Sequence, residues 1–171
     1  MRLYKLTDQD WLTRPGEWNQ TLWGPGVTNR VMTAEEIFEK FNFFHEKKPR
    51  HERNKTSMSS IQFELKLDSL CSVAWIHAYV CPEAAAAFNM WHADIRNPVL
   101  WVCDFKGEVK FDGNNKEKVG VKELTTIKII NMPGYDFDRT AFTIRAFNKY
   151  DEFKSSYEMK QQENENASTD L

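Results

Sequence analysis

The chain has 171 residues, 41% of them hydrophobic and 13% aromatic, and its 23 basic and 25 acidic side chains leave a formal net charge of -2. This near balance of charge argues against nucleic acid or an anionic membrane surface as the partner. No apolar run approaches the roughly 18 residues that span a bilayer, and the N-terminus lacks an apolar segment of signal-peptide length, so we expect no membrane contact and a cytoplasmic location.

The first third of the chain predicts short strands followed by a helix. Alternating residues 3–6 indicate an opening strand, and the Pro-Gly and Gly-Pro-Gly breakers within residues 11–28 favour short strands joined by tight turns. Thr33 and Glu36 form a capping box that should start a helix, and Pro49 should end it. The apolar face of this helix consists of Ile37, Phe38, Phe41 and Phe44.

A basic segment, residues 47–55, follows this helix. It contains Arg50 and Arg53, and its composition is compatible with either a solvated loop or a phosphate-binding loop. No aromatic side chains alternate with the basic ones, as a stacking surface for bases would require, so we expect no nucleic-acid binding here. Residues 61–67 alternate strictly between apolar and polar and predict a strand with one buried face.

The centre of the chain predicts a strand, a helix and a second strand. Residues 73–80 indicate a buried strand. Pro82 suits the first position of a helix, four alanines of high helix propensity follow, and Phe88 and Trp91 are the expected bulky anchors. Residues 99–105 are apolar on both faces, which is typical of a strand in the middle of a sheet.

The last third predicts strands and one further helix. The expected strands cover residues 108–111, 118–121 and 123–130, with a hairpin turn at 112–115. A helix should cover residues 139–150, and the polar composition of residues 151–171 predicts a disordered tail. Because the strands come in runs, we expect an α+β fold: a mostly antiparallel, turn-rich sheet with about three packed helices in one domain over residues 1–150.

Cysteine and histidine offer two kinds of chemistry. Cys71, His77, Cys81 and His92 are possible zinc ligands, but their spacing matches no standard zinc pattern. A catalytic Cys–His pair would need a reactive thiol, whereas cysteines within apolar strands, such as Cys103, are usually inert packing residues. We therefore predict no metal, no cofactor and reduced thiols.

Another group of side chains has the properties of a nucleotide-handling cleft: flat aromatic faces, a cation for phosphate and a proton-transfer group. The group consists of Tyr4, Arg14, Trp23, His77, Tyr79 and Trp91. The alternative, more frequent for such residues, places His77 and Tyr79 in the sheet core as packing residues. An open, polar cleft against Trp23, His77 and Tyr79 would favour ligand binding, and complete burial of all three would favour packing.

The chain resembles a family of small uncharacterised proteins encoded by tailed bacteriophages and prophages. The matching phrases are residues 3–7, 21–24, 70–71, 76–79, 97–98, 100–101, 118–121 and 124–125, together with Pro82, Ala86 and Gly107. Members of that family have a shorter link after the Trp-Gly turn, so residues 33–67 resemble an insertion that carries a helix and a basic loop. The resemblance implies a phage origin and no particular activity.

Two functions are therefore expected. The first is a non-catalytic phage accessory protein that acts in the host cytoplasm, in host takeover or counter-defence. It would bind a host protein or a signalling nucleotide, with Arg50 and Arg53 on the partner surface.

The alternative is an enzyme that acts on a nucleotide or NAD-like substrate. The turn-rich sheet with its His-x-Tyr strand resembles the ADP-ribosyltransferase fold, at the level of fold analogy. His77 would transfer a proton, and Glu108 or Glu123 would supply the acidic group that such a transferase needs. Arg14 would bind phosphate, with Trp23 or Tyr79 stacking on a ring.

Overall fold

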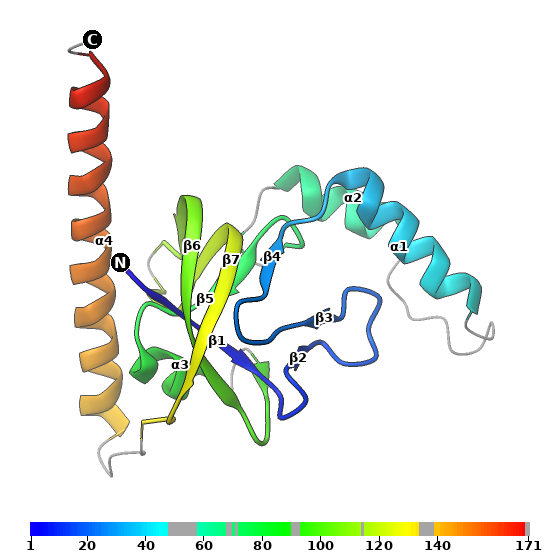
Figure 1. Cartoon of the computed structure of the whole chain (residues 1–171), viewed down its shortest axis with the longest axis horizontal. Coiled ribbons are helices and arrows are strands. Elements are labelled where there is room, and N and C mark those ends of the chain that lie inside the picture. The colour runs from blue at the N-terminus through cyan, green and yellow to red at the C-terminus, as the bar shows by residue number, and fades with distance from the viewer. Residues whose placement is uncertain are drawn as a thin grey trace.

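The computed structural model describes residues 1–47, 58–67, 70, 72–89, 93–113, 115–133 and 139–169. Within these residues the fold is α+β, as the sequence predicts, with helices packed against a mostly antiparallel sheet (Figure 1).

The sheet is built around one long hairpin. β6 (Val99–Phe111) and β7 (Val119–Ile130) pair antiparallel over most of their length, and both are rich in the β-branched and aromatic residues that favour strands. β6 lies between its neighbours in the sheet, so the prediction of a central strand over residues 99–105 is confirmed. β7 is one strand where two were predicted, over residues 118–121 and 123–130.

The sheet curls until its ends meet. β1 (Leu3–Thr7) pairs with β6, and β5 (Ile76–Ala78) pairs with β7. Tyr79, directly after β5, then pairs with Tyr4 of β1, because the N–H of each donates to the carbonyl oxygen of the other at 2.8 Å. Two register shifts between β6 and β7, the second spanning Gly107 of β6 at φ 81°, provide the bend that this closure needs. We call the meeting point the Tyr4–Tyr79 seam.

The remaining strands are short. β4 (Thr28–Arg30) pairs with β7, and β2 (Leu12–Thr13) with β3 (Thr21–Leu22) forms a separate two-stranded ribbon. The prediction of short strands and tight turns in this region is therefore confirmed. The strand predicted over residues 73–80 is shorter than expected, because turns precede β5 and only its three residues pair with β7.

α3 (Pro82–Phe88) begins at the predicted proline. Cys81 caps it, with Sγ accepting a hydrogen bond from the Ala84 N–H at 3.4 Å. Residues 84–87 are buried, and their small side chains let the helix lie close to β1 and to the C-terminal helix. Phe88 is buried as expected, whereas Trp91 lies outside the described residues.

The C-terminal helix, α4 (Arg139–Thr169), is longer than the sequence predicts. Its buried residues are Phe142, Ala146 and Tyr150. Over residues 151–169 the structure differs from the disordered tail expected at 151–171. Phe153 and Tyr157 continue the apolar face against β6, and the Glu- and Gln-rich segment beyond them suits a helix. Figure 1 shows the C-terminal part of α4 extending past the sheet.

α1 (Ala34–Lys47) starts with the predicted capping box. The Thr33 N–H donates to Glu36 Oε2 at 2.7 Å, and the Glu36 N–H donates to Thr33 Oγ1 at 3.3 Å. Arg30 of β4 also binds both oxygens of Glu36, at 2.8 and 2.5 Å, and these contacts lower the pKa of Glu36 to about 2. The helix start is thereby tied to the sheet.

α2 (Met58–Leu67) occupies residues for which the alternating pattern predicts a strand over 61–67, so that prediction is wrong. Ile61 is buried while Met58 and Leu65 are partly buried, which is the three- and four-residue spacing of a helix. These side chains join α1 in a small second core whose buried members are Trp18, Ile37, Phe41 and Ile61.

Removing the cap of α1 should weaken this second core. We expect Thr33→Ala to lower the free energy of unfolding by about 1 kcal/mol, because the Glu36 N–H loses its acceptor. Urea unfolding followed by circular dichroism measures the loss. Thr33→Ser keeps the hydroxyl and should remain close to the parent protein; an equal loss in both variants would contradict a role for the cap.

Candidate functional site

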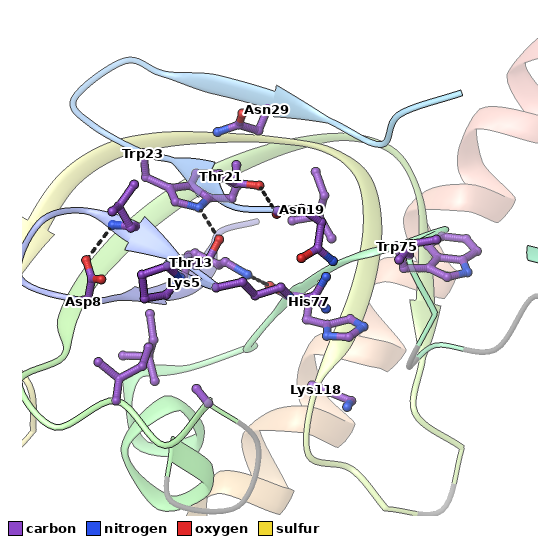
Figure 2. Close-up of a pocket in the computed structure, with 18 of the residues that line it drawn as sticks. Lys5, Asp8, Thr13, Asn19, Thr21, Trp23, Asn29, Trp75, His77 and Lys118 are labelled. Atoms are coloured by element: carbon purple, nitrogen blue, oxygen red, sulfur yellow. Dashed lines mark hydrogen bonds between the residues drawn. The ribbon is translucent and has the colours of Figure 1, made fainter. Parts of the chain in front are cut away.

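A cavity of about 620 Å³ lies beside the curled sheet, bounded by β1, the β2–β3 ribbon, β4, β5 and residues 93–96 (Figure 2). The charged residues that line it are Lys5, Asp8, Arg14, Arg30, Asp94, Arg96 and Lys118. Its aromatic and imidazole lining consists of Trp23, Trp75, His77 and Tyr79. Since these residues come from distant parts of the chain, the cavity exists only in the closed sheet.

Positive charge dominates this lining, with five cationic side chains against two carboxylates. Asp8 is already engaged, because its Oδ1 accepts hydrogen bonds from the N–H groups of Asp10 at 3.0 Å and Leu12 at 2.7 Å. Glu36, outside the cavity, balances Arg30. Within the lining itself cations outnumber carboxylates, which suits an anionic ligand.

Lys5 lies among the cavity residues between Trp23 and His77 in Figure 2. Its Nζ donates to the carbonyl oxygen of His77 at 2.7 Å and lies 5.4 Å from the ring centroid of Trp23. Burial, and secondly the charge of Arg14, lower the pKa of Lys5 to about 8. A measurable share of this amine is therefore uncharged near neutral pH.

His77 does not have the properties of a proton-transfer group. Its Nε2 contacts the carbonyl oxygen of Leu70, which can only accept a hydrogen bond, so Nε2 carries the proton of the neutral ring. Burial, followed by the charge of Lys5, lowers the pKa of His77 to about 3. The imidazole is thus neutral at physiological pH and fixed to the backbone.

The aromatic residues form closed walls. Trp23 is 2% exposed, and its indole N–H donates to Thr13 Oγ1 at 3.1 Å. Tyr79 is 6% exposed, and burial raises the pKa of its hydroxyl, which stays protonated. Little of either ring is accessible for stacking on a ligand. Trp23 and Tyr79 therefore form apolar walls of the cavity, and the lining cations are the groups that can make polar contacts with a ligand.

Two lining residues have an unusual backbone. Arg14 and Asp94 have φ values of 56° and 46°, in the left-handed region that residues other than glycine rarely adopt. Arg14 lies in the loop between β2 and β3, and Asp94 lies in the segment after α3. Both are exposed at the rim of the cavity, where backbone strain often accompanies a functional position.

The structure brings four of the six sequence-derived cleft residues to one cavity: Arg14, Trp23, His77 and Tyr79. Tyr4 is on the other face of β1, since neighbouring side chains of a strand alternate, and it packs on the main core. Glu108, exposed on β6, and Glu123, which pairs with Lys106 at 3.0 Å, are not among the lining residues. Trp91, Arg50 and Arg53 lie outside the described residues.

Four cations of the lining were not predicted from the sequence: Lys5, Arg30, Arg96 and Lys118. A lysine that alternates with apolar residues in a strand normally indicates a solvent-facing position. Lys5 instead lies on a covered face because the sheet closes on itself. The signal in the sequence was that apolar Leu3 and Leu6 fall on opposite faces of this strand, and both are buried in the structure.

The cysteines that the structure describes are packing residues. Burial raises the pKa of Cys81 to about 11 and that of Cys103 to about 12, so both thiols are protonated and weakly nucleophilic. Across the described ranges, no three residues among His, Cys, Asp and Glu gather as a metal site would require. No helix within those ranges is long and apolar enough to cross a membrane.

In comparisons with known proteins, no family model, no curated protein and no solved structure matches the chain.

Proposed function

We propose that this protein binds a small phosphorylated organic molecule in the cavity, and that it acts as a binding protein. The observation that carries the proposal is the excess of cations around one cavity. Burial is the main cause of the lowered pKa of Lys5 and of His77, and nearby cations lower both further: Arg14 acts on Lys5, and Lys5, Lys118 and Arg14 act on His77. A bound anion would relieve this repulsion, which makes its binding favourable.

The size and the rim of the cavity support a ligand of nucleotide size. About 620 Å³ falls within the range of small-molecule sites, roughly 300–1,000 Å³. Arg14 and Arg96 are exposed at the rim, and guanidinium groups suit phosphate because they can bind two of its oxygens at once. A signalling nucleotide, one of the two partners expected from the sequence, has this size and charge.

The properties of His77 and Glu108 support binding over the alternative of catalysis by these two residues. His77 is neutral and hydrogen-bonded to the backbone, and Glu108 is not part of the cavity lining. A role in host takeover or counter-defence stays a prediction from the resemblance to phage proteins, as does a partner surface at Arg50 and Arg53.

Calorimetric titration with nucleoside mono- and diphosphates, their parent nucleosides and inorganic phosphate tests the proposal. We expect the phosphorylated compounds to bind and the nucleosides to bind far more weakly, with affinity falling as salt rises. Arg14→Gln and Arg96→Gln should each weaken binding by about tenfold, the value of a lost hydrogen bond between charged groups. Arg145→Gln, at an exposed position on α4, is the matched control. Equal affinity for nucleosides and nucleotides would overturn the proposal.

A further inference from the structure

The position of Lys5 distinguishes it from the other cations of the cavity. Arg14, Arg30 and Arg96 are exposed and Lys118 is buried, whereas Lys5 is half-buried and stands in the interior of β1. Its amine is held between two fixed groups, the carbonyl oxygen of His77 at 2.7 Å and the ring of Trp23 at 5.4 Å (Figure 2). The amine therefore has a defined place on the wall of a cavity large enough to hold a ligand beside it.

Burial of Lys5, and secondly the charge near it, favour the uncharged form of its amine, although the carbonyl oxygen of His77 and the Trp23 ring favour the ammonium ion. Arg14, from the β2–β3 loop, repels the ammonium ion, and His77, from β5, is itself neutral. The Cys103 thiol of β6 stays protonated because its pKa is about 12, so it supplies no negative charge to offset Arg14. Asp8 is engaged with backbone N–H groups. Desolvation together with a neighbouring cation is the arrangement that turns a lysine into a nucleophile.

We propose that Lys5 Nζ forms an imine with the carbonyl carbon of a ligand held in the cavity, and that the ligand class is a phosphorylated aldehyde or ketone. The proposal rests on the proposed function, because the rim cations Arg14 and Arg96 would hold the phosphate while the carbonyl group reaches Lys5.

The step needs no further reactant. The lone pair of the neutral amine forms the new N–C bond as the carbonyl π electrons move to oxygen, giving a carbinolamine. That oxygen then leaves as water with the two protons originally on the amine nitrogen, and a C=N bond remains. Since an uncharged amine has two N–H bonds and one lone pair, it can keep its hydrogen bond to the His77 carbonyl oxygen while the lone pair attacks.

The test uses pyridoxal 5′-phosphate and pyridoxal as carbonyl probes, followed by borohydride reduction, which makes an imine permanent. Mass spectrometry of the digested protein then locates the adduct. We expect pyridoxal 5′-phosphate to label Lys5 at least tenfold faster than it labels exposed lysines such as Lys106, and the rate should rise with pH through about 8, where the amine loses its proton. Excess nucleotide should protect Lys5.

Lys5→Arg is the matched variant, because it keeps the positive charge and removes the nucleophile. It should lose the fast adduct, and Lys5→Gln gives the same loss of adduct if the arginine variant fails to fold. Nucleotide binding without fast labelling of Lys5 would overturn the imine and leave the proposed function standing. Equal labelling of Lys5 by pyridoxal and its phosphate would support the imine and overturn the anion site. Uniform labelling of all lysines would overturn the imine.

Discussion

Trp101→Ala is expected to lower the free energy of unfolding by about 3–5 kcal/mol, the range for removing a buried tryptophan from a core. Trp101 is 0% exposed near the start of β6, directly opposite Lys5 of β1. Its indole N–H donates to Thr7 Oγ1 at 3.1 Å, and the edge of its ring contacts Trp11 with the ring centroids 5.7 Å apart. The loss would be a large share of the stability of a domain of this size.

Urea unfolding measures this loss. The Trp101→Phe variant separates the contribution of the aromatic ring from that of the indole N–H. Phenylalanine keeps an aromatic ring but not the N–H, and Thr7 Oγ1 still donates to the Asp8 carbonyl oxygen at 3.0 Å. We therefore expect the phenylalanine variant to lose clearly less than the alanine variant. A change below about 1 kcal/mol in Trp101→Ala would show that the core does not depend on this side chain.

Shortening α4 should have effects that depend sharply on where the chain ends. A chain that ends at Tyr150 loses Phe153 and Tyr157, which cover Phe105 and Phe111 of β6 with ring centroids 5.8 to 6.5 Å apart. It also loses the hydrogen bond from the Val109 N–H to the Tyr157 hydroxyl at 3.0 Å. Together these losses should lower the free energy of unfolding by roughly 2–4 kcal/mol.

A chain that ends at Lys160 is the control, because residues 161–167 are exposed. Its unfolding midpoint in urea should stay close to that of the full chain. If both shortened chains are as stable as the full chain, the domain ends near residue 150, as the composition of the last segment predicts, and α4 beyond that residue contributes nothing to the fold.

Features that depend on residues close together in the sequence could be predicted, whereas features that depend on distant contacts could not. The capping box at Thr33, the helix start at Pro82 and the central strand from Val99 depend on neighbouring residues, and all three were predictable. The segment 61–67 was not, because its alternating apolar residues fit a strand while Ile61 and Leu65 also share one helix face. Packing against α1 selects the helix.

Only part of the cavity lining could be predicted, because the rest of it depends on contacts between distant residues. Arg14, Trp23, His77 and Tyr79 were identified from their chemistry alone, and the fold brings them together. Lys5 and Lys118 carry no local mark, since only the closure of the sheet turns their side chains toward the same space. Contacts between residues distant in the sequence thus determine which polar side chains share the site.

The Tyr4–Tyr79 seam has a consequence for association between molecules. β1 pairs with the backbone of β6 from Val99 to Cys103, whose N–H and carbonyl groups would otherwise form an open strand edge, and the seam in turn pairs the other edge of β1 with Tyr79. Such an edge is a template for pairing with another chain. Loss of the first seven residues would therefore remove Lys5 from the cavity and, at the same time, make the protein prone to aggregate.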